Sequence, residues 1–539
     1  MYQLVNTMLI NKNKNNPSTK IVFVRKDKDG NKTFQYVEDV KLKYYYNKPE
    51  YMDIGMVNFI EPEKVNGRIC RYDDLYKDMA SVMNGKLKNF YIEAVNSGEG
   101  VFSKLRRMHL DYGFHGTDKN IVDSYITAFY KKHNPDENLF GITKAFMDIE
   151  VDGSVIVGFP EPSLAEAPVN VITLVCDNGH VYTLCLKYDT ETYENCMSQQ
   201  EELINDLKER YKDAKWDFKF KIEEFDDELD LIKRFFYIVN EIERPDFMAA
   251  WNATFDYQYL YNRILKLDAD PATVCCPEDL EYKGVHIKID TKNSDPCDKS
   301  DLFEFNGYSV YVDQLAIYAN LRKSAKEESY ALDYIGGKLL GIHKDKVEGD
   351  IKTFHFVDYR KFLFYNIQDA IMLLQIEEKN KDFDLFQKVA SLTETRVTHA
   401  LKKTVCLRNL ADKFYRDKGL IISNNRSKLY VKDESSKIRG AFVGDPNHTA
   451  FNGMEIAGRV SKFLYESVID FDLSSLYPSI ILAFNISPET CIGKIKVDSD
   501  IGDAEQLLND FASGDVINFG KKWMNLPGIE DILNEIDNI

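Results

Sequence analysis

A chain of 539 residues is too long for a single hydrophobic core and is expected to form about three or four domains. Its 44% hydrophobic and 29% charged residues exclude global disorder, and no apolar run reaches the roughly 18 residues that a membrane span needs. The nine cysteines include no C-x-x-C pair, which favours a reducing cytoplasm, and the net charge of −18, taken alone, argues against a nucleic-acid-binding protein.

Residues 1–140 mix short β-like runs with polar loops and are predicted to form an N-terminal α+β domain. They carry 22 Lys and Arg against 18 Asp and Glu residues, so the excess negative charge lies further along the chain. From residue 144 strands and amphipathic helices follow one another, which predicts an α/β domain with a mixed sheet over 141–382. Residues 268–310, rich in Asp, Pro, Cys and Lys, are expected to be an insertion or loop.

Four soft metal ligands lie within that last segment. They are Cys275, Cys276, His286 and Cys297. Their spacing matches no standard zinc knuckle, so an ordinary loop is favoured over a zinc site.

A pair of carboxylates lies on the first predicted strand of the α/β domain, in the sequence AFMDIEV. Asp148 and Glu150 are two residues apart, so their side chains point to the same face of the strand. Two converging carboxylates repel each other unless a cation compensates, and hard oxygen ligands favour Mg²⁺ or Mn²⁺. A solvated pair on an edge strand is the alternative for such a motif in isolation.

Two further acidic motifs follow. In WNATFD a short buried strand ends and Asp256 falls in the first turn of a helix, where a negative charge is favourable in itself. In YNIQD, Tyr365 and Asp369 are four residues apart on a helix and share a face. In isolation the second pair could equally be a half-buried tyrosine beside a surface aspartate.

In this order, D-x-E on a strand, N-x-x-F-D at a helix start and Y-x-x-x-D on a later helix resemble the 3′→5′ proofreading exonuclease of the family-B DNA polymerases, an RNase H-like fold. Intervals of 108 and 113 residues between Asp148, Asp256 and Asp369 suit one domain. The resemblance implies that Tyr365 orients the attacking water and that Phe255 contacts DNA. It also implies four ligands for two Mg²⁺ or Mn²⁺ ions, namely Asp148, Glu150, Asp256 and Asp369.

Residues 470–481, DFDLSSLYPSII, resemble the first palm signature of the same family. Asp472 stands three residues before Ser475 and aligns with the metal-binding aspartate, whereas no role is assigned to its neighbour Asp470. The resemblance implies that a turn and helix start bind the nucleotide, through Leu473, Ser474, Ser475, Leu476 and Tyr477, and an anion on such a turn is physically reasonable. The alternative is a Tyr-Pro turn that leads into a buried helix.

Other segments agree with this resemblance, which is nearest to the replicative polymerases of T-even-type bacteriophages. They are GFPEP at 158–162 and NISPET at 485–490. Arg439, Gly440 and Ala441 resemble the loop between exonuclease and palm that contacts the template strand, although the arginine departs from the usual family pattern. Residues 431–539 are accordingly predicted to form a partial palm, and part of 383–430 to pack on the N-terminal domain.

The palm motifs that should follow, a K-x3-N-S-x-Y-G helix and a D-T-D-S hairpin, do not occur in the sequence. The expectation is therefore a split or truncated polymerase, in which a second chain supplies fingers, the remaining palm and thumb. Single-stranded DNA and primer-template would be its substrates, and dNTP and palm Mg²⁺ would bind only with that partner. The alternatives are a stand-alone 3′→5′ exonuclease with a vestigial palm and a non-catalytic nucleic-acid-binding module.

Overall fold

The computed structural model describes residues 2–13, 16–51, 59–82, 113–117, 119–133, 141–293, 295–344, 351–424, 475–486, 501–522 and 530. The chain forms two compact units, Met1–Ser436 and Lys437–Ile539, and each is considered by itself. No helix within the described ranges has the length and apolar character to span a membrane. The predicted domain boundaries at 140 and 382 remain predictions.

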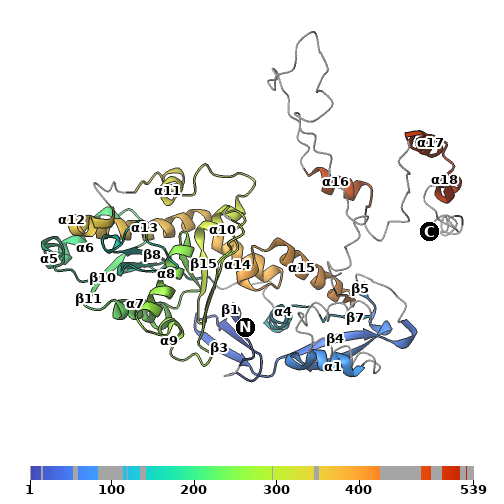
Figure 1. The fold of residues 1–539 in the computed structure, drawn as a ribbon, viewed down its shortest axis with the longest axis horizontal. Coiled ribbons are helices and arrows are strands. Elements are labelled where there is room, and N and C mark those ends of the chain that lie inside the picture. Colours follow the sequence, from blue (N-terminus) through green and yellow to red (C-terminus); the bar gives the residue numbers. More distant parts are fainter. Residues whose placement is uncertain are drawn as a thin grey trace, which may run out of the picture. The chain divides into compact units, whose positions relative to one another are not determined.

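The first unit contains a mixed eight-stranded sheet in the order β11-β10-β9-β8-β12-β15-β14-β13. Figure 1 labels four of these strands, β8, β10, β11 and β15. Strands β8, β12 and β15 run parallel, and β9 runs antiparallel to β8. This confirms the predicted mixed α/β fold. The strands are β8 (Lys144–Val151), β9 (Val169–Cys176), β10 (His180–Leu186), β11 (Lys219–Phe225), β12 (Phe247–Ala250), β13 (Val285–Lys288), β14 (Leu302–Phe305) and β15 (Val310–Asp313).

Side chains of β8 alternate between two hydrophobic cores. Met147 and Ile149 belong to the core that α7 (Glu228–Tyr237) and α8 (Ala253–Lys266) form on one face of the sheet. Phe146 belongs to the core on the other face, where α13 (Tyr359–Asn380) packs. Asp148 and Glu150 share the parity of Phe146 and therefore point to the α13 face.

Several shorter helices complete the α13 face and leave this long helix almost wholly buried. They are α5 (Glu191–Ser198), α6 (Gln200–Arg210), α10 (Gln314–Leu321), α11 (Leu332–Leu340), α12 (Phe354–Val357) and α14 (Asp382–Leu392). Helix α13 begins at the N-cap Asp358, whose carboxylate accepts the Lys361 amide.

The expectation of a loop or insertion at 268–310 is wrong in part. This segment contains α9 (Pro271–Cys275) and the strands β13 and β14, which extend the sheet. The strands have only four residues each and bury one face at most, so their alternation is too short to stand out among the charged residues around them.

The N-terminal residues form two small antiparallel sheets, β1-β2-β3 and β6-β4-β7. The first is fixed to the large sheet by buried ion pairs, because the ammonium groups of Lys26 and Lys32 both contact the Asp246 carboxylate just before β12. The elements of this region are β1 (Gln3–Ile10), β2 (Lys20–Lys26), β3 (Lys32–Val37), β4 (Lys41–Asn47), β5 (Phe59–Ile60), β6 (Val65–Arg71), α1 (Leu75–Val82), β7 (Phe114–His115) and α4 (Ile121–His133).

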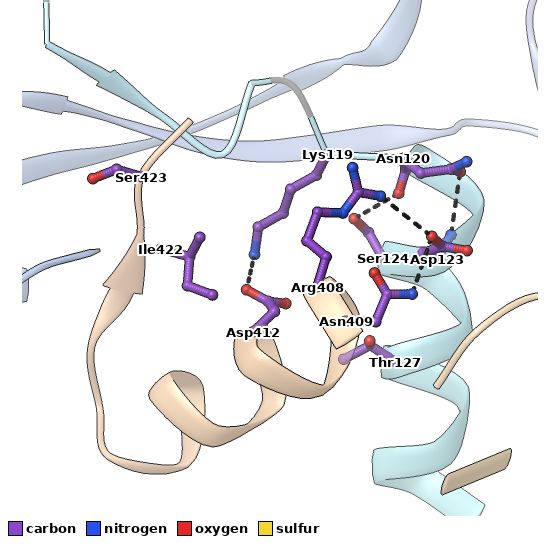
Figure 2. Close-up of a pocket in the computed structure, with 10 residues that line it drawn as sticks. All are labelled: Lys119, Asn120, Asp123, Ser124, Thr127, Arg408, Asn409, Asp412, Ile422 and Ser423. Atoms are coloured by element: carbon purple, nitrogen blue, oxygen red, sulfur yellow. Dashed lines mark hydrogen bonds and ion pairs between the residues drawn. The ribbon is translucent and has the colours of Figure 1, made fainter. Parts of the chain in front are cut away.

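Helix α15 (Lys403–Asp417) and strand β16 (Ile421–Ile422) return to this N-terminal region. Strand β16 pairs with β5. Figure 2 shows the polar pocket where α4 and α15 face each other. There Lys119 donates to Asp412 at 2.6 Å and Asn409 donates to Asp123 at 3.1 Å.

The described part of the second unit consists of α16 (Leu476–Ala483), α17 (Ile501–Ala512) and α18 (Val516–Lys522). Helix α16 is apolar around most of its circumference, yet none of its residues is buried. Leu482 is 82% exposed and Tyr477 is 65% exposed.

Candidate active site

The D-x-E carboxylates are half-buried at the carboxyl-terminal end of β8. Asp148 accepts a hydrogen bond of 2.7 Å from the side-chain amide of Asn366, which lies on α13. Asp148 and Glu150 thus point to the face of the sheet that meets α13, as strand alternation predicts. The YNIQD motif on α13 contacts the D-x-E motif on β8 directly through this hydrogen bond.

Asp256, on helix α8, also contacts strand β8. It lies in the first turn of α8, which follows β12, the parallel neighbour of β8. Its carboxylate is 4% exposed and accepts backbone N–H groups from Ile149 and from its own residue. Ile149 stands between Asp148 and Glu150, so this hydrogen bond brings the second motif to the first.

Tyr365 and Asp369 lie on one face of α13, as predicted from their spacing. Asp369 is only 2% exposed, and its negative charge acts on Asp148, Glu150 and Tyr365. The three motifs, separated by more than 100 residues each, therefore meet at one end of the sheet.

Electrostatics confirm that the carboxylates share one environment. Burial, and then the Asp369 charge, raise the pKa of Asp148 to about 7. Burial, Asp148 and Asp369 raise the pKa of Glu150 well above its usual range, and burial and Asp148 do the same for the pKa of Asp256. Such mutual destabilisation of charged forms is common at functional sites.

Two residues that the motifs did not single out also belong to the cluster. The Lys344 ammonium donates to the Asp369 carboxylate and, at 3.2 Å, to the Tyr365 hydroxyl. Burial lowers the pKa of Lys344, but Asp369, Tyr365 and Asp148 outweigh it, so the net shift is upward. Asn366 shares the face of Asp369 at i, i+3 spacing, a signal that was available in the sequence, whereas Lys344 lies in a loop without periodicity.

Comparison with known proteins shows which family two segments of the chain match. Residues 130–335 match the family described as DNA polymerase family B, exonuclease domain, and residues 396–519 match DNA polymerase family B. The chain belongs to the family B DNA polymerases. Both halves of the predicted resemblance, exonuclease and polymerase, are thereby confirmed.

Relatives of this family B chain come from phages and archaea. It is 27% identical over 363 residues to the DNA-directed DNA polymerase of Escherichia phage RB69, which is 66% of this chain and 36% of that protein. It is 27% identical over 384 residues to DNA polymerase 1 of Sulfolobus acidocaldarius, covering 67% and 37%. It is 23% identical over 443 residues to the DNA-directed DNA polymerase of Enterobacteria phage T4, which is 80% of this chain and 44% of that protein. The matched region spans less than half of each relative.

The donor set of this family B exonuclease domain suits hard divalent ions. All four predicted ligands are carboxylates, and their mutual repulsion is what a cation would relieve. As they lie, no three Asp, Glu, His or Cys side chains among the described residues are gathered closely enough to hold an ion. The carboxylates of Asp148, Glu150, Asp256 and Asp369 converge without closing into a coordination group, and the Lys344 ammonium partly compensates their charge.

Two aromatic rings, one exposed and one partly buried, belong to two of the motif segments. Phe159 follows β8 in the GFPEP sequence, is 81% exposed, and its ring centroid lies 6.0 Å from that of Phe255. Phe255 immediately precedes Asp256 in the chain. Sequence reasoning noted GFPEP only as a likeness and did not assign Phe159 a role.

The structure describes three of the residues predicted to bind nucleotide or template DNA in the palm region. Ser475 has a left-handed backbone (φ 56°) as N-cap of α16, and Leu476 and Tyr477 follow on that helix, exposed. Six predicted residues lie outside the described residues, namely Arg439, Gly440, Ala441, Asp472, Leu473 and Ser474.

Two of the four residues weighed as a zinc site have hydrogen-bond partners of their own. The Cys276 thiol exchanges hydrogen bonds with the Gly284 backbone, and the Cys297 thiol lies 3.2 Å from the Tyr330 hydroxyl. His286 lies on β13 opposite Glu304 of β14.

Proposed function

We propose that this chain is a 3′→5′ exonuclease acting on single-stranded DNA and frayed primer ends, the proofreading activity of a family B DNA polymerase. The observation that carries the proposal is the convergence of four carboxylates from three distant segments at one end of the sheet, with Tyr365 beside them. Four carboxylates without a histidine base suit hydrolysis of a phosphodiester by two-metal catalysis.

Asp148, Glu150, Asp256 and Asp369 would hold two Mg²⁺ or Mn²⁺ ions, which when bound supply the Lewis acidity that activates water and stabilises the leaving 3′-oxygen. The chain's own residues then set the geometry. Asn366 fixes the carboxylate of Asp148 through its amide. The raised pKa of Asp148 makes its charge, and with it cation binding, sensitive to pH near neutrality.

Tyr365 acts in this proposal as a hydrogen-bonding residue that orients the attacking water. Burial, and then the Asp369 charge, raise the pKa of Tyr365 to about 12, so its hydroxyl stays protonated at neutral pH. Lys344, which donates to that hydroxyl, fixes its orientation and adds positive charge close to where the phosphate would bind.

The exposed ring of Phe159, which lies beside the partly buried ring of Phe255, supplies a surface on which unpaired bases stack. Stacking on aromatic side chains is tolerant of sequence, which a proofreading enzyme requires because any base can be misincorporated. Duplex DNA has no unstacked bases to offer, so this pair favours single strands and frayed ends.

The palm residues are carried over from the family and remain proposals. Asp472 would hold a palm Mg²⁺, residues 473–477 would bind the triphosphate and sugar of a dNTP, and Arg439, Gly440 and Ala441 would contact the template. Synthesis needs a second palm carboxylate, which the K-x3-N-S-x-Y-G and D-T-D-S motifs would bring and which residues 1–539 do not contain. A second chain with fingers, palm remainder and thumb is our hypothesis for their source, in the cytoplasm of a host cell.

The deciding experiment is digestion of a 5′-labelled single strand in Mg²⁺ by this chain, with Asp256→Ala as the control. A ladder of 3′-shortened products that disappears in the variant is expected. Folded protein that leaves the strand intact, or an Asp256→Ala variant as active as the original, contradicts the proposal. Adding candidate partner chains and dNTP then separates a split polymerase, which extends a primer, from a stand-alone exonuclease, which does not.

A further inference from the structure

Helix α8, which carries Asp256, begins in an unusual way. Its N-cap Asn252 has a left-handed backbone (φ 63°, ψ 50°) and makes no side-chain cap hydrogen bond to the first turn. Asparagine tolerates this conformation better than most residues, but the backbone amides at the start of the helix still need acceptors. The position of Asp256 depends on this turn, because only three residues separate it from Asn252.

The acceptor comes from the neighbouring strand. Asp313 is the last residue of β15, in register with Ala250 at the end of β12. Its Oδ1 atom accepts the Asn252 amide at 3.1 Å, and the carboxylate also accepts the Ala253 amide. The same carboxylate is the N-cap of α10, where it accepts the Leu315 amide at 3.0 Å. One buried side chain therefore caps two helices.

A second contact holds the same turn. The Thr254 hydroxyl donates to the Asp301 carboxylate and accepts from Lys299, whose ammonium lies 2.9 Å from Asp301. Asp301, Lys299 and Asp313 line one cavity beneath the α8 turn. Asp313 is 6% exposed, and its Oδ2 atom is buried without a hydrogen-bond partner among the described residues.

We propose that Asp313 is a positioning residue for the exonuclease, which holds the backbone at the start of α8 and so sets where the Asp256 carboxylate meets β8. The inference rests on the proposed exonuclease activity. Asp313 acts as a hydrogen-bond acceptor for backbone amides, so an asparagine at this position keeps the function, whereas a side chain without an acceptor loses it. Displacements near 1 Å at a reacting centre cost on the order of 100-fold in rate.

Three substitutions in the full chain test this. Asp313→Asn keeps the Oδ1 acceptor and is expected to retain kcat within about threefold, since Asn and Asp cap helices equally well. Asp313→Ala is expected to lower kcat by about 10- to 100-fold. Asp313→Ser can still cap α10 but is too short to reach Asn252, and it is expected to behave like Asp313→Ala while folding normally. Asp227→Ala, which removes the N-cap of α7, is the matched control and leaves kcat unchanged.

Two readouts do not depend on activity. Hydrogen–deuterium exchange of the peptide spanning residues 247–258 is expected to rise in Asp313→Ser and Asp313→Ala and to stay at the wild-type level in Asp313→Asn. Mn²⁺ affinity, followed by electron paramagnetic resonance, is expected to fall by about 10- to 100-fold in the same two variants. Losses of this size are typical when a residue that orients a metal ligand is replaced.

The outcomes separate the two proposals. Wild-type protein without exonuclease activity rejects the proposed function itself. An active wild type together with unchanged kcat, exchange and Mn²⁺ binding in Asp313→Ser overturns the positioning role alone. Equal losses in Asp313→Asn and Asp313→Ala also overturn it, because they would show that the charge of Asp313 matters rather than its acceptor atom.

Discussion

Two regions of the molecule show opposite mismatches between side chains and their surroundings. One is the sheet end that carries Asp148, and the other is helix α16, which includes Leu476 and Tyr477 of the 470–481 motif. At the sheet end, half-buried and buried carboxylates gather, and burial, followed by their mutual repulsion, raises the pKa values of Asp148, Glu150 and Asp256. On α16, apolar residues such as Leu482 are exposed. The first mismatch is produced by packing of three segments around a charge cluster. In the second, no described residue of α16 is buried.

The comparison teaches that a motif becomes a site only through its neighbours. D-x-E acquires a defined environment because α8 and α13 reach it and supply the Ile149–Asp256 and Asn366–Asp148 hydrogen bonds. Buried, mutually repelling carboxylates lower stability and are retained where function requires them. The predictions below test each side of this contrast.

The largest effect is expected for the ligands themselves. Asp369→Ala should lower exonuclease kcat by about a thousandfold, because Lewis-acid stabilisation is worth several kcal/mol and each 1.36 kcal/mol is about tenfold in rate. Single-turnover digestion of a labelled strand in Mg²⁺ measures this. Asp230→Ala, a carboxylate exposed on α7, is the control and should retain wild-type activity. A loss below about tenfold in Asp369→Ala would remove this residue from the ligand set.

Tyr365→Phe should lower kcat by about 100-fold. A positioned side chain that takes part in proton transfer typically contributes about 100- to 10,000-fold to the rate, and a hydroxyl that only orients the water is expected at the lower end. The Michaelis constant for DNA should change little. Tyr359→Phe is the matched control, since this hydroxyl is buried in the core at the start of the same helix. Comparable losses in both variants would mean that α13 packing, rather than the Tyr365 hydroxyl, is what matters.

Phe159→Ala should weaken binding of single-stranded DNA by about 5- to 150-fold, since stacking of one base on an aromatic ring is worth about 1–3 kcal/mol. Fluorescence anisotropy of a labelled oligonucleotide in EDTA measures the dissociation constant without cleavage. Tyr237→Ala removes an aromatic side chain that is 47% exposed on α7 and serves as the control. Equal affinities of Phe159→Ala and wild type would remove the stacking surface from the proposal.

The buried charge cluster predicts a dependence of stability on pH. The pKa of Asp148 is about 7 in the folded protein and 3.8 for an ordinary aspartate, so between these values the folded state binds the extra proton. Folding stability therefore falls as pH rises from about 4 to 7, by at most about 1.4 kcal/mol per pH unit for this group.

Asp148→Asn removes this contribution. In EDTA, the midpoint of its thermal unfolding should exceed that of wild type by more at pH 8 than at pH 5. Asp227→Asn, an exposed helix cap, should show the same difference at both pH values. A constant difference for Asp148→Asn would show that its carboxylate is not held in its neutral form by the fold.

The smallest effect concerns the other region. Leu482→Ser should reduce binding of a hydrophobic dye by the full chain, because this side chain is 82% exposed on an apolar helix. Leu265→Ser, on α8, replaces an apolar side chain that is 47% exposed and is the control. If dye binding falls equally in both variants, Leu482 on α16 contributes no more to dye binding than an isolated exposed leucine such as Leu265.

The mixed α/β class, the three acidic motifs and the face shared by Asp148 and Glu150 could all be predicted from the amino-acid sequence. These follow from local periodicity, since alternation along a strand and the i, i+4 spacing of Tyr365 and Asp369 need no knowledge of the partners. The family was readable from the order of the motifs, and the comparisons confirmed it.

Only the tertiary structure decided which residues support the carboxylates. Lys344 lies in a loop without periodicity, and Asp313 reads as an ordinary helix cap, so neither carries a sequence signal toward the site. The strands β13 and β14 were missed for a similar reason, because four residues at a sheet edge give too short an alternation. Contacts between segments 60 or more residues apart arise from strand register and helix packing, which local patterns do not encode.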